Sequence, residues 1–453
     1  MLRTTFVLLI IAMGMPIFLK DAFGALLLYL FIAYFRPDYW VWNFGFIRSL
    51  NLSLLSGVYL LGRSLLSGTK LRFDLRSTLL FLFVAVSFMS TVMSPRDDYA
   101  FPYFRDFAKT IIVSYLIFVL VSNLVQFRTV VLVMCYSLCF EAAHQGWFRL
   151  ILNPGGRNDN HMVMLGDNNG VAVGMMMVVP LFIALARTSE HRWEKWLHYF
   201  MMIGVAYRGI STYSRGGFLA GATVTMIYIA RSERKLRSAV AAVVVIGALL
   251  SVLPEDFWVR MSTIPTSQEM VEEVAEGDTE IDGSMTGRLH YWRVAVDMAV
   301  ANPLFGVGLN AYSRLYNQYD FSRGQYGGRR SVHSLWFGVM AELGIPAFLL
   351  FLLMLALAVG ACEGVARQSR RGELPRDFYV FAVAVQTGFG AVIVGATFLS
   401  FQYTEILWHF VGLSMALRAV AMETATAAVP SQVDPHSAEM FGGLQPARTA
   451  SGT

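Results

Sequence analysis

The sequence predicts an all-α protein that crosses a membrane many times. Of its 453 residues, 56% are hydrophobic and 15% are charged, and the mean hydropathy is +0.52. Soluble domains average about 45–50% apolar and about 25% charged residues. The apolar runs lack the alternation of barrel strands, and helices are the other structure that satisfies its own backbone hydrogen bonds in lipid. We therefore predict a polytopic integral membrane protein with about 12–13 transmembrane helices, each near the ~17–20 residues that cross a hydrocarbon core.

Apolar segments follow one another from the first residues to position 420. They lie at 4–19, 22–35, 50–62, 78–93, 107–125, 129–148, 168–186, 196–212, 216–230, 238–253, 334–358, 379–399 and 404–420. The first begins like a signal peptide, with Arg3 before an apolar run. It has no small-residue cleavage site and many apolar segments follow, so we interpret it as a first span.

The three cysteines do not define a disulfide framework. Cys135 and Cys139 lie one helical turn apart in an apolar run, and Cys362 lies at the end of a span. We interpret all three as packing residues.

The charges of the short loops predict the orientation, because cytoplasmic loops carry an excess of Lys and Arg. One alternate set of loops holds 16 Lys and Arg, and the opposite set holds 9. The first set comprises 63–77, 126–128, 187–195, 231–237 and 359–378, and the second comprises 36–49, 94–109, 149–161 and 208–215. The first set is therefore expected in the cytoplasm. We interpret the net charge of +5 as the Lys and Arg surplus that orients the helices in the membrane, and no nucleic-acid partner is expected.

This topology divides the chain into five parts. Residues 1–150 form N-terminal transmembrane helices, 151–253 central ones and 334–420 C-terminal ones. Residues 254–333 form a large periplasmic loop, and 421–453, rich in Ala, Thr, Ser and Pro, a disordered cytoplasmic tail.

The large loop is expected to be partly helical. Its acidic stretch, Glu269 to Asp282, is expected to be solvated and mobile. A helix is predicted from Gly287 to Ala301, capped by Thr286 and stopped by Asn302-Pro303.

One face of this helix is expected to turn towards the membrane domain. Arg288, Trp292, Ala295 and Ala299 recur at helical spacing on that face. An arginine in the first turn opposes the helix dipole unless an anion is also bound. The helix N-terminus and Arg288 together therefore predict a seat for an anion. The alternative for Arg288 is a structural ion pair with an acid of the loop.

Arg215 and His333 lie at the same predicted face of the membrane as Arg288. Arg215 stands in Ser214-Arg215-Gly216-Gly217, where the glycines let a ligand or another backbone approach closely. His333 stands where the large loop re-enters the membrane. Nearby guanidinium groups would keep its imidazole neutral, and a neutral imidazole is a competent general base. The alternatives are an arginine extended to lipid headgroups and an ordinary interfacial histidine.

Several weaker candidates accompany these three. Asn169, in Asp167-Asn168-Asn169-Gly170, could bind sugar hydroxyls or simply form a turn. Arg329 and Arg330 could line an approach for an anionic substrate or face anionic lipid. Glu342, inside a span, needs a partner and is either structural or orienting. No metal-ligand or nucleotide-binding spacing occurs, so neither a metal nor another cofactor is expected.

Four of these motifs together resemble the O-antigen ligase/polymerase superfamily over residues 160–420. They occur in the family's order: Ser214-Arg215-Gly216-Gly217, then Thr286-Gly287-Arg288 with Trp292, then Asn302-Pro303-Leu304-Phe305-Gly306-Val307-Gly308, and His333-Ser334-Leu335-Trp336 through Glu342-Leu343-Gly344-Ile345-Pro346. The N-terminal Phe35-Arg36-Pro37 and Tyr39-Trp40 resemble the branch of O-glycosylation ligases associated with exosortase systems.

The resemblance implies an enzyme of the bacterial inner membrane whose active site faces the periplasm. It would take a glycan from undecaprenyl diphosphate and transfer it to a hydroxyl of lipid A core, another glycan or a protein. Arg215 and Arg288 would hold the diphosphate, and His333 would be the catalytic base, with Trp292 as a possible substrate contact. Ser334 stands where many relatives have Asn, and Ala347 where glycine is common.

Three other functions remain open at this point. A polymerase that joins repeat units would use the same chemistry with another acceptor. A flippase or transporter is less expected, because no internal repeat with paired broken helices occurs. A membrane scaffold without activity is the least expected, because the two arginines and the histidine would then have no function.

Overall fold

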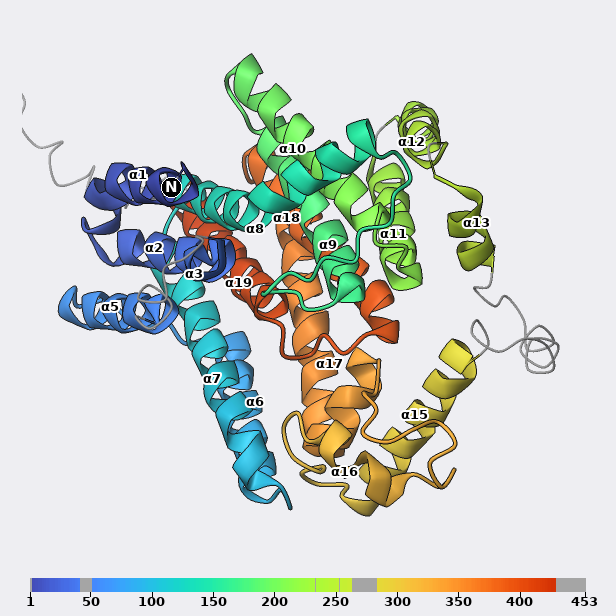
Figure 1. The fold of residues 1–453 in the computed structure, drawn as a ribbon. Coiled ribbons are helices and arrows are strands. Elements are labelled where there is room, and N and C mark those ends of the chain that lie inside the picture. The colour runs from blue at the N-terminus through green and yellow to red at the C-terminus, as the bar shows by residue number, and fades with distance from the viewer. Residues whose placement is uncertain (1, 41–50, 233, 252, 263–282, 429–453) are drawn as a thin grey trace, which may run out of the picture.

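The computed structural model describes residues 2–40, 51–232, 234–251, 253–262 and 283–428. Across these residues the chain forms helices and no strand, apart from one isolated bridge between Met162 and Gly166 (Figure 1). The predicted all-α class is confirmed. Each of the predicted apolar segments contains a helix: α1 (Leu2–Phe18), α2 (Ala22–Phe35), α5 (Leu52–Leu66), α6 (Leu75–Val92), α7 (Asp97–Leu120), α8 (Leu124–Leu152), α9 (Asn168–Arg187), α10 (Arg192–Ile210), α11 (Arg215–Arg231), α12 (Lys235–Leu250), α17 (Leu335–Arg370), α18 (Arg376–Gly395) and α19 (Glu405–Ala428).

Six of these helices are long and apolar enough, by length and composition, to cross a membrane. They are α6, α8, α9, α17, α18 together with the short helix η1 (Ala396–Phe398), and α19. The protein is therefore a polytopic α-helical membrane protein, and the total number of spans remains a prediction.

Helix α9 forms the centre of the bundle, with 89% of its apolar window buried. It packs against α10, α11 and α18, and these four helices stand together in the middle of Figure 1. Small residues allow this close packing. A side chain added at Gly388 of α18, for example, would meet the Met177 carbonyl oxygen of α9 at 2.9 Å. The buried cysteines 135, 139 and 362 are free thiols, as expected for packing residues.

The loops group as the charge pattern predicts. Within the set expected in the cytoplasm, ion pairs join Arg128 to Glu194 and Arg72 to Glu423 at the end of α19. Within the opposite set, Arg208 donates to the carbonyl oxygens of Asn158 and Asn160. Which set faces the cytoplasm remains a prediction.

Two helices extend beyond their predicted ends. Helix α17 continues through the expected loop at 359–378 as far as Arg370, and α19 continues to Ala428 instead of ending near 421. The α17 extension contains Ala, Glu, Gln and Arg, and the α19 extension contains four Ala with Met and Glu; these residues favour helix whether or not the segment is apolar. The rest of the expected disordered tail, and the acidic stretch Glu269 to Asp282, lie outside the described residues.

The connection between α12 and α17 contains α13 (Glu255–Ser262), α15 (Gly283–Ala301), the short helix α16 (Tyr312–Tyr319) and irregular chain. The predicted helix 287–301 is α15, but it begins at Gly283. Thr286 therefore lies inside the helix and is not its cap. Arg288 lies in the second turn, so the predicted anion seat at this helix N-terminus is wrong. Gly287 costs the helix only about 1 kcal/mol, too little to end it there.

Helix α17 bends at Gly344, whose backbone angles are φ 85° and ψ 176°. The bend leaves backbone groups of α17 without hydrogen-bond partners inside the helix, and the segment 303–308 supplies those partners. The Val307 and Gly308 amides donate to the carbonyls of Ala341 and Glu342, both at 3.0 Å, and the Ile345 amide donates to Pro303 at 2.9 Å. The two motifs 302–308 and 342–346 therefore form one joint.

Glu342 is a structural member of this joint. Its side chain is buried and accepts hydrogen bonds from the Tyr312 amide at 3.3 Å and from Gln402 Nε2 at 3.2 Å. Of the two roles open from the sequence, the structure supports the structural one.

Candidate active site

Arg215 and Arg288 line one pocket, although 73 positions separate them along the chain and they belong to different helices. The empty space between its lining atoms is about 340 Å³ including open solvent, and only about 20 Å³ of it can hold the centre of a water-sized sphere. Helices α9, α11, α15 and the turn from α18 into η1 build its walls. The lining residues are Asn169, Val173, Ser214, Arg215, Gly216, Arg288, Gly395, Phe398 and Leu399.

Arg215 is the first residue of α11. Ser214 caps this helix, its Oγ accepting the Gly217 amide at 3.2 Å. Gly216 lets α11 approach α18, because an added Cβ would lie 2.9 Å from the Gly395 carbonyl oxygen. A helix N-terminus carries partial positive charge, to which the Arg215 guanidinium adds a full one. The combination of arginine and helix N-terminus expected at Arg288 therefore occurs at Arg215.

Arg288 reaches the pocket from the face of α15 that the sequence predicted. One turn further along, the Trp292 ring stacks on Phe337 of α17 with centroids 5.1 Å apart. It also lies 5.9 Å from the ring of Phe398, which lines the pocket. Ala295 is fully buried on the same face. Packing of α15 on α17 thus sets the position from which Arg288 extends.

His333 is not a lining residue of this pocket, but it lies close enough to Arg288 and Asp167 for their charges to affect its pKa, and its backbone is strained. Its φ of 47° is left-handed, a conformation that costs a residue other than glycine about 1–3 kcal/mol and often occurs at functional sites. Its ring lies 6.2 Å from that of Tyr291 on α15, measured between centroids. Burial lowers the pKa of His333, the charge of Arg288 lowers it further, and the carboxylate of Asp167 opposes both. The imidazole is therefore mainly neutral at neutral pH.

The weaker candidates lie at different distances from this centre. Asn169 lines the pocket, and its Nδ2 donates to Asp167 at 3.4 Å. Arg330 is exposed, its Nε donates to the Tyr326 carbonyl at 2.6 Å, and its charge also lowers the pKa of His333. Arg329 is exposed, and its amide donates to Asn317 Oδ1 at 2.9 Å. Its side chain is not part of the pocket lining.

Asp167 and Phe398 were not predicted individually as site residues. Asp167 caps α9, with its Oδ1 accepting the Gly170 amide at 2.9 Å, and its charge reaches His333. Its position two residues before Asn169, at the start of a span, was a usable signal. Phe398 has no such signal, because it belongs to an apolar run and reaches the pocket only through the turn after α18.

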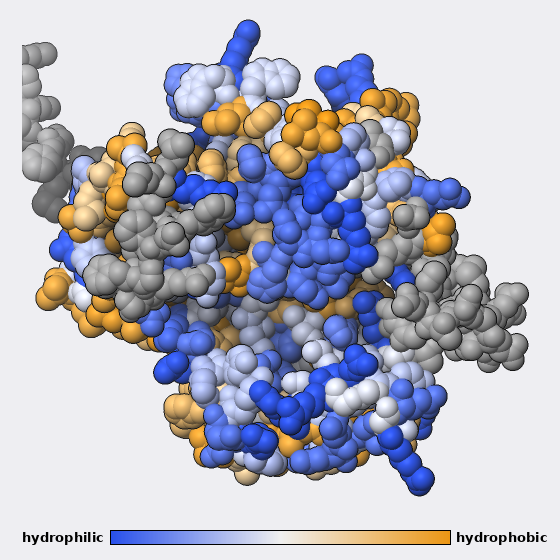
Figure 2. Space-filling view, viewed as in Figure 1, coloured by the Kyte–Doolittle hydropathy of each residue, from blue (hydrophilic) through white to orange (hydrophobic). Residues whose placement is uncertain are grey.

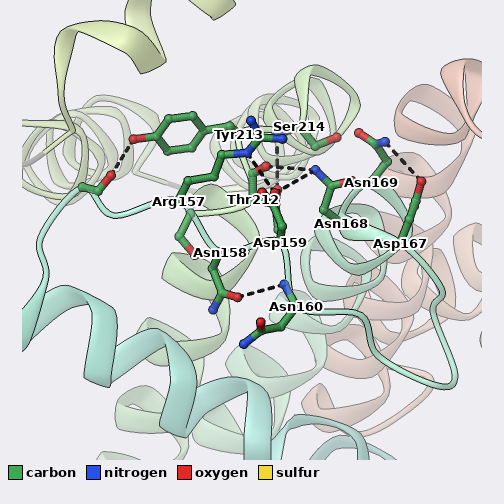
Figure 3. Close-up of polar contacts among 12 residues, drawn as sticks. Arg157, Asn158, Asp159, Asn160, Asp167, Asn168, Asn169, Thr212, Tyr213 and Ser214 are labelled. Carbon is green, nitrogen blue, oxygen red and sulfur yellow. Dashed lines mark hydrogen bonds and ion pairs between the residues drawn. The ribbon is translucent and has the colours of Figure 1, made fainter.

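A polar loop, residues 153–167, leads from the end of α8 to the pocket. Figure 3 shows its side chains facing the turn between α10 and α11. Tyr213 donates to the Gly155 carbonyl, and the Asn158 amide donates to the Ser211 carbonyl at 2.8 Å. In Figure 2, hydrophilic surface gathers over this loop and, lower in the view, over α15 and α16.

Fold and site together define a class: a polytopic helical membrane protein with an arginine-lined pocket beside a neutral histidine. Residues 200–352, which include Arg215, Arg288 and His333, match the O-antigen ligase family. This match supports the O-antigen ligase/polymerase superfamily for that part of the chain. Residues 1–190 match a family of unknown function (DUF5935). No curated protein matches the chain.

Proposed function

We propose that the protein transfers a glycan from undecaprenyl diphosphate to a hydroxyl group of an acceptor, in the manner of an O-antigen ligase. The observation that carries this proposal is the pocket shared by Arg215 and Arg288, with His333 near enough for the Arg288 charge to lower its pKa. Two guanidinium groups suit a diphosphate, and a neutral imidazole suits a hydroxyl that must lose its proton.

The reaction is a direct displacement at the anomeric carbon. His333 takes the proton of the acceptor hydroxyl while that oxygen bonds to the anomeric carbon. The bond from this carbon to the diphosphate oxygen breaks, and its electron pair leaves with undecaprenyl diphosphate. The anomeric centre is inverted. General-base catalysis of this kind contributes typically ~10²–10⁴-fold to the rate.

The arginines stabilise the charge that develops on the leaving group. Hydrogen bonds to charged groups contribute about 1.5–3 kcal/mol each, and a guanidinium can bind two phosphate oxygens at once. Because the charge increases as the bond breaks, these contacts favour the transition state over the bound donor. Two arginines thereby supply charge that a divalent metal supplies in other enzymes.

The apolar wall of the pocket suits the lipid part of the donor. Val173, Phe398 and Leu399 line the same space as the arginines, so the isoprenoid next to the diphosphate has an apolar surface to contact. We place this site at the periplasmic face of the bacterial inner membrane, because the loops beside it carry the smaller share of Lys and Arg.

The test is transfer by purified protein in nanodiscs, using the lipid-linked glycan that accumulates when the gene is deleted. His333→Ala should abolish transfer and leave thermal unfolding unchanged, whereas His191→Ala, at an exposed position outside the pocket, should retain both. Wild-type transfer by His333→Ala would remove the proposed base. Growth of long chains from the lipid-linked glycan alone would instead identify a polymerase, and flux without transfer would identify a transporter.

A further inference from the structure

A second cavity lies between the last turns of α8 and the loop 153–167. Its volume is about 190 Å³. An engineered cavity of about 150 Å³ in another protein binds benzene, so this space is large enough for one six-membered ring. We call it the α8 pocket, defined by its lining residues His144, Gln145, Phe148, Arg149, Asn158 and Asn160.

The chemistry of the α8 pocket suits a sugar ring. Asn160 is exposed and brings a side-chain amide that can donate and accept hydrogen bonds, as sugar hydroxyls do. The amides of Gln145 and Asn158 are already bonded to Glu141, to each other and to the Asn160 backbone amide, and they form the fixed wall behind it. Phe148 is 50% exposed and offers an aromatic face to the C–H face of a ring. Arg149 is the one permanent cation of the lining, whereas the arginine-lined pocket holds two.

The protein holds the wall of the α8 pocket in place before any ligand binds. Asn158 is 1% exposed, and its Nδ2 donates to Gln145 Oε1 at 3.3 Å. The buried Arg208 donates to the carbonyl oxygens of Asn158 at 3.1 Å and Asn160 at 2.7 Å. A wall that is ordered in advance loses less freedom on binding, which favours affinity.

A row of polar side chains connects the α8 pocket with the arginine-lined pocket. Asp159 lies between two lining residues of the α8 pocket, and its Oδ1 accepts hydrogen bonds from Arg157 at 2.8 Å and Asn168 at 3.4 Å. The next residue after Asn168 is Asn169, which lines the arginine-lined pocket. Figure 3 shows this row running along the loop to the start of α9.

We propose that the α8 pocket is a carbohydrate subsite that binds a sugar ring of the donor glycan while its diphosphate occupies the arginine-lined pocket. This inference rests on the proposed function and identifies where the glycan is recognised. It also gives a role to the region of unknown function, because α8 and the loop both fall within residues 1–190.

The test measures binding of the free oligosaccharide, so it does not depend on transfer. The probe is the oligosaccharide released by mild acid from the lipid-linked glycan that accumulates in the deletion strain. Its binding to the full-length protein in nanodiscs is followed by saturation-transfer NMR and titration. Phe148→Ala combined with Asn160→Ala removes two contacts of the α8 pocket. Ile151→Ala combined with His161→Ala is the matched control, since both residues are exposed neighbours outside the lining.

The pocket variant should bind the oligosaccharide about tenfold more weakly, because it loses one aromatic contact and one hydrogen-bonding amide. The control variant and His333→Ala should bind it like the wild type. Equal binding by pocket and control variants overturns the proposal, as does a wild type that does not bind the oligosaccharide. Displacement of the oligosaccharide by glycerol phosphate would assign the pocket to a lipid headgroup and also overturn it. Transfer by the wild type reports separately on the proposed function.

Discussion

Replacement of Gly344 by alanine should disrupt the joint between α17 and the segment 302–308. The backbone at Gly344 has φ 85° and ψ 176°, a region that glycine alone occupies readily and that costs other residues about 1–3 kcal/mol. An added Cβ would lie 2.6 Å from the Leu304 carbonyl oxygen and 2.9 Å from the Phe305 nitrogen. Both are backbone atoms, so the segment itself must move.

Movement of the segment should break the backbone hydrogen bonds that Val307, Gly308 and Ile345 donate across the joint. With a net contribution of about 1 kcal/mol for each bond and about 1–3 kcal/mol of backbone strain, the total loss is roughly 4–6 kcal/mol. At about 2–4 °C per kcal/mol for large domains, the Tm should fall on the order of 10 °C. Transfer should fall as well. The joint contains none of the proposed site residues, but it sets where α15 and α17 meet.

The matched control is Gly360→Ala on the same helix. No atom lies within 4 Å of a Cβ added at Gly360, and alanine is favoured over glycine in a helix by about 0.5–1 kcal/mol. Thermal unfolding of the purified variants, followed by tryptophan fluorescence, compares the two. If Gly344→Ala unfolds at the same temperature as Gly360→Ala, the joint does not stabilise this protein and the reasoning fails.

Three other predictions concern the chemistry of the site. Asp167→Asn keeps a capping oxygen for α9 but removes the charge that raises the pKa of His333. Since the base must be neutral, the acidic limb of the pH–rate profile, which lies below about 6.5, should move to lower pH. A limb that does not move would show that Asp167 has no effect on the base. Arg215→Lys should reduce kcat/KM by roughly 10–100-fold in the nanodisc assay, because an ammonium group cannot bind two phosphate oxygens at once; full activity would exclude bidentate binding. Transfer should persist after dialysis against EDTA, and restoration by Mg²⁺ of an activity lost to EDTA would contradict the role given to the arginines.

The helices were predictable because the length of an apolar run is a local property of the sequence. The end of α17 was not, since polar residues with high helix propensity extend this helix beyond the pattern that hydrophobicity predicts. The start of α15 was not either, because the residues 283–286, Gly-Ser-Met-Thr, have mostly low helix propensity and no local rule places a helix start there. Local rules also placed the combination of arginine and helix N-terminus at Arg288, whereas the fold provides it at Arg215.

Only some of the residues that meet in the arginine-lined pocket were predicted from the sequence. Arg215, Arg288 and Asn169 were selected as charged or polar residues at one predicted face of the membrane, and the structure brings them together. Phe398 reaches the same pocket through tertiary packing, which no spacing in the sequence expresses. Asp167 could have been selected, because a capping acid at the start of a span lies at the same face as the arginines.

The joint at Gly344 links the two parts of the proposed mechanism. Arg288 is carried by α15, which ends where the joint begins, and His333 lies just before α17, which the joint bends. The position of α15 against α17 therefore determines where Arg288 stands relative to His333. Arg215 depends on a different contact, that of α11 with α18 at Gly216. The α8 pocket depends on neither, because its walls come from α8 and a loop held by Arg208. Substitutions in the α8 pocket should therefore leave Arg215, Arg288 and His333 in place.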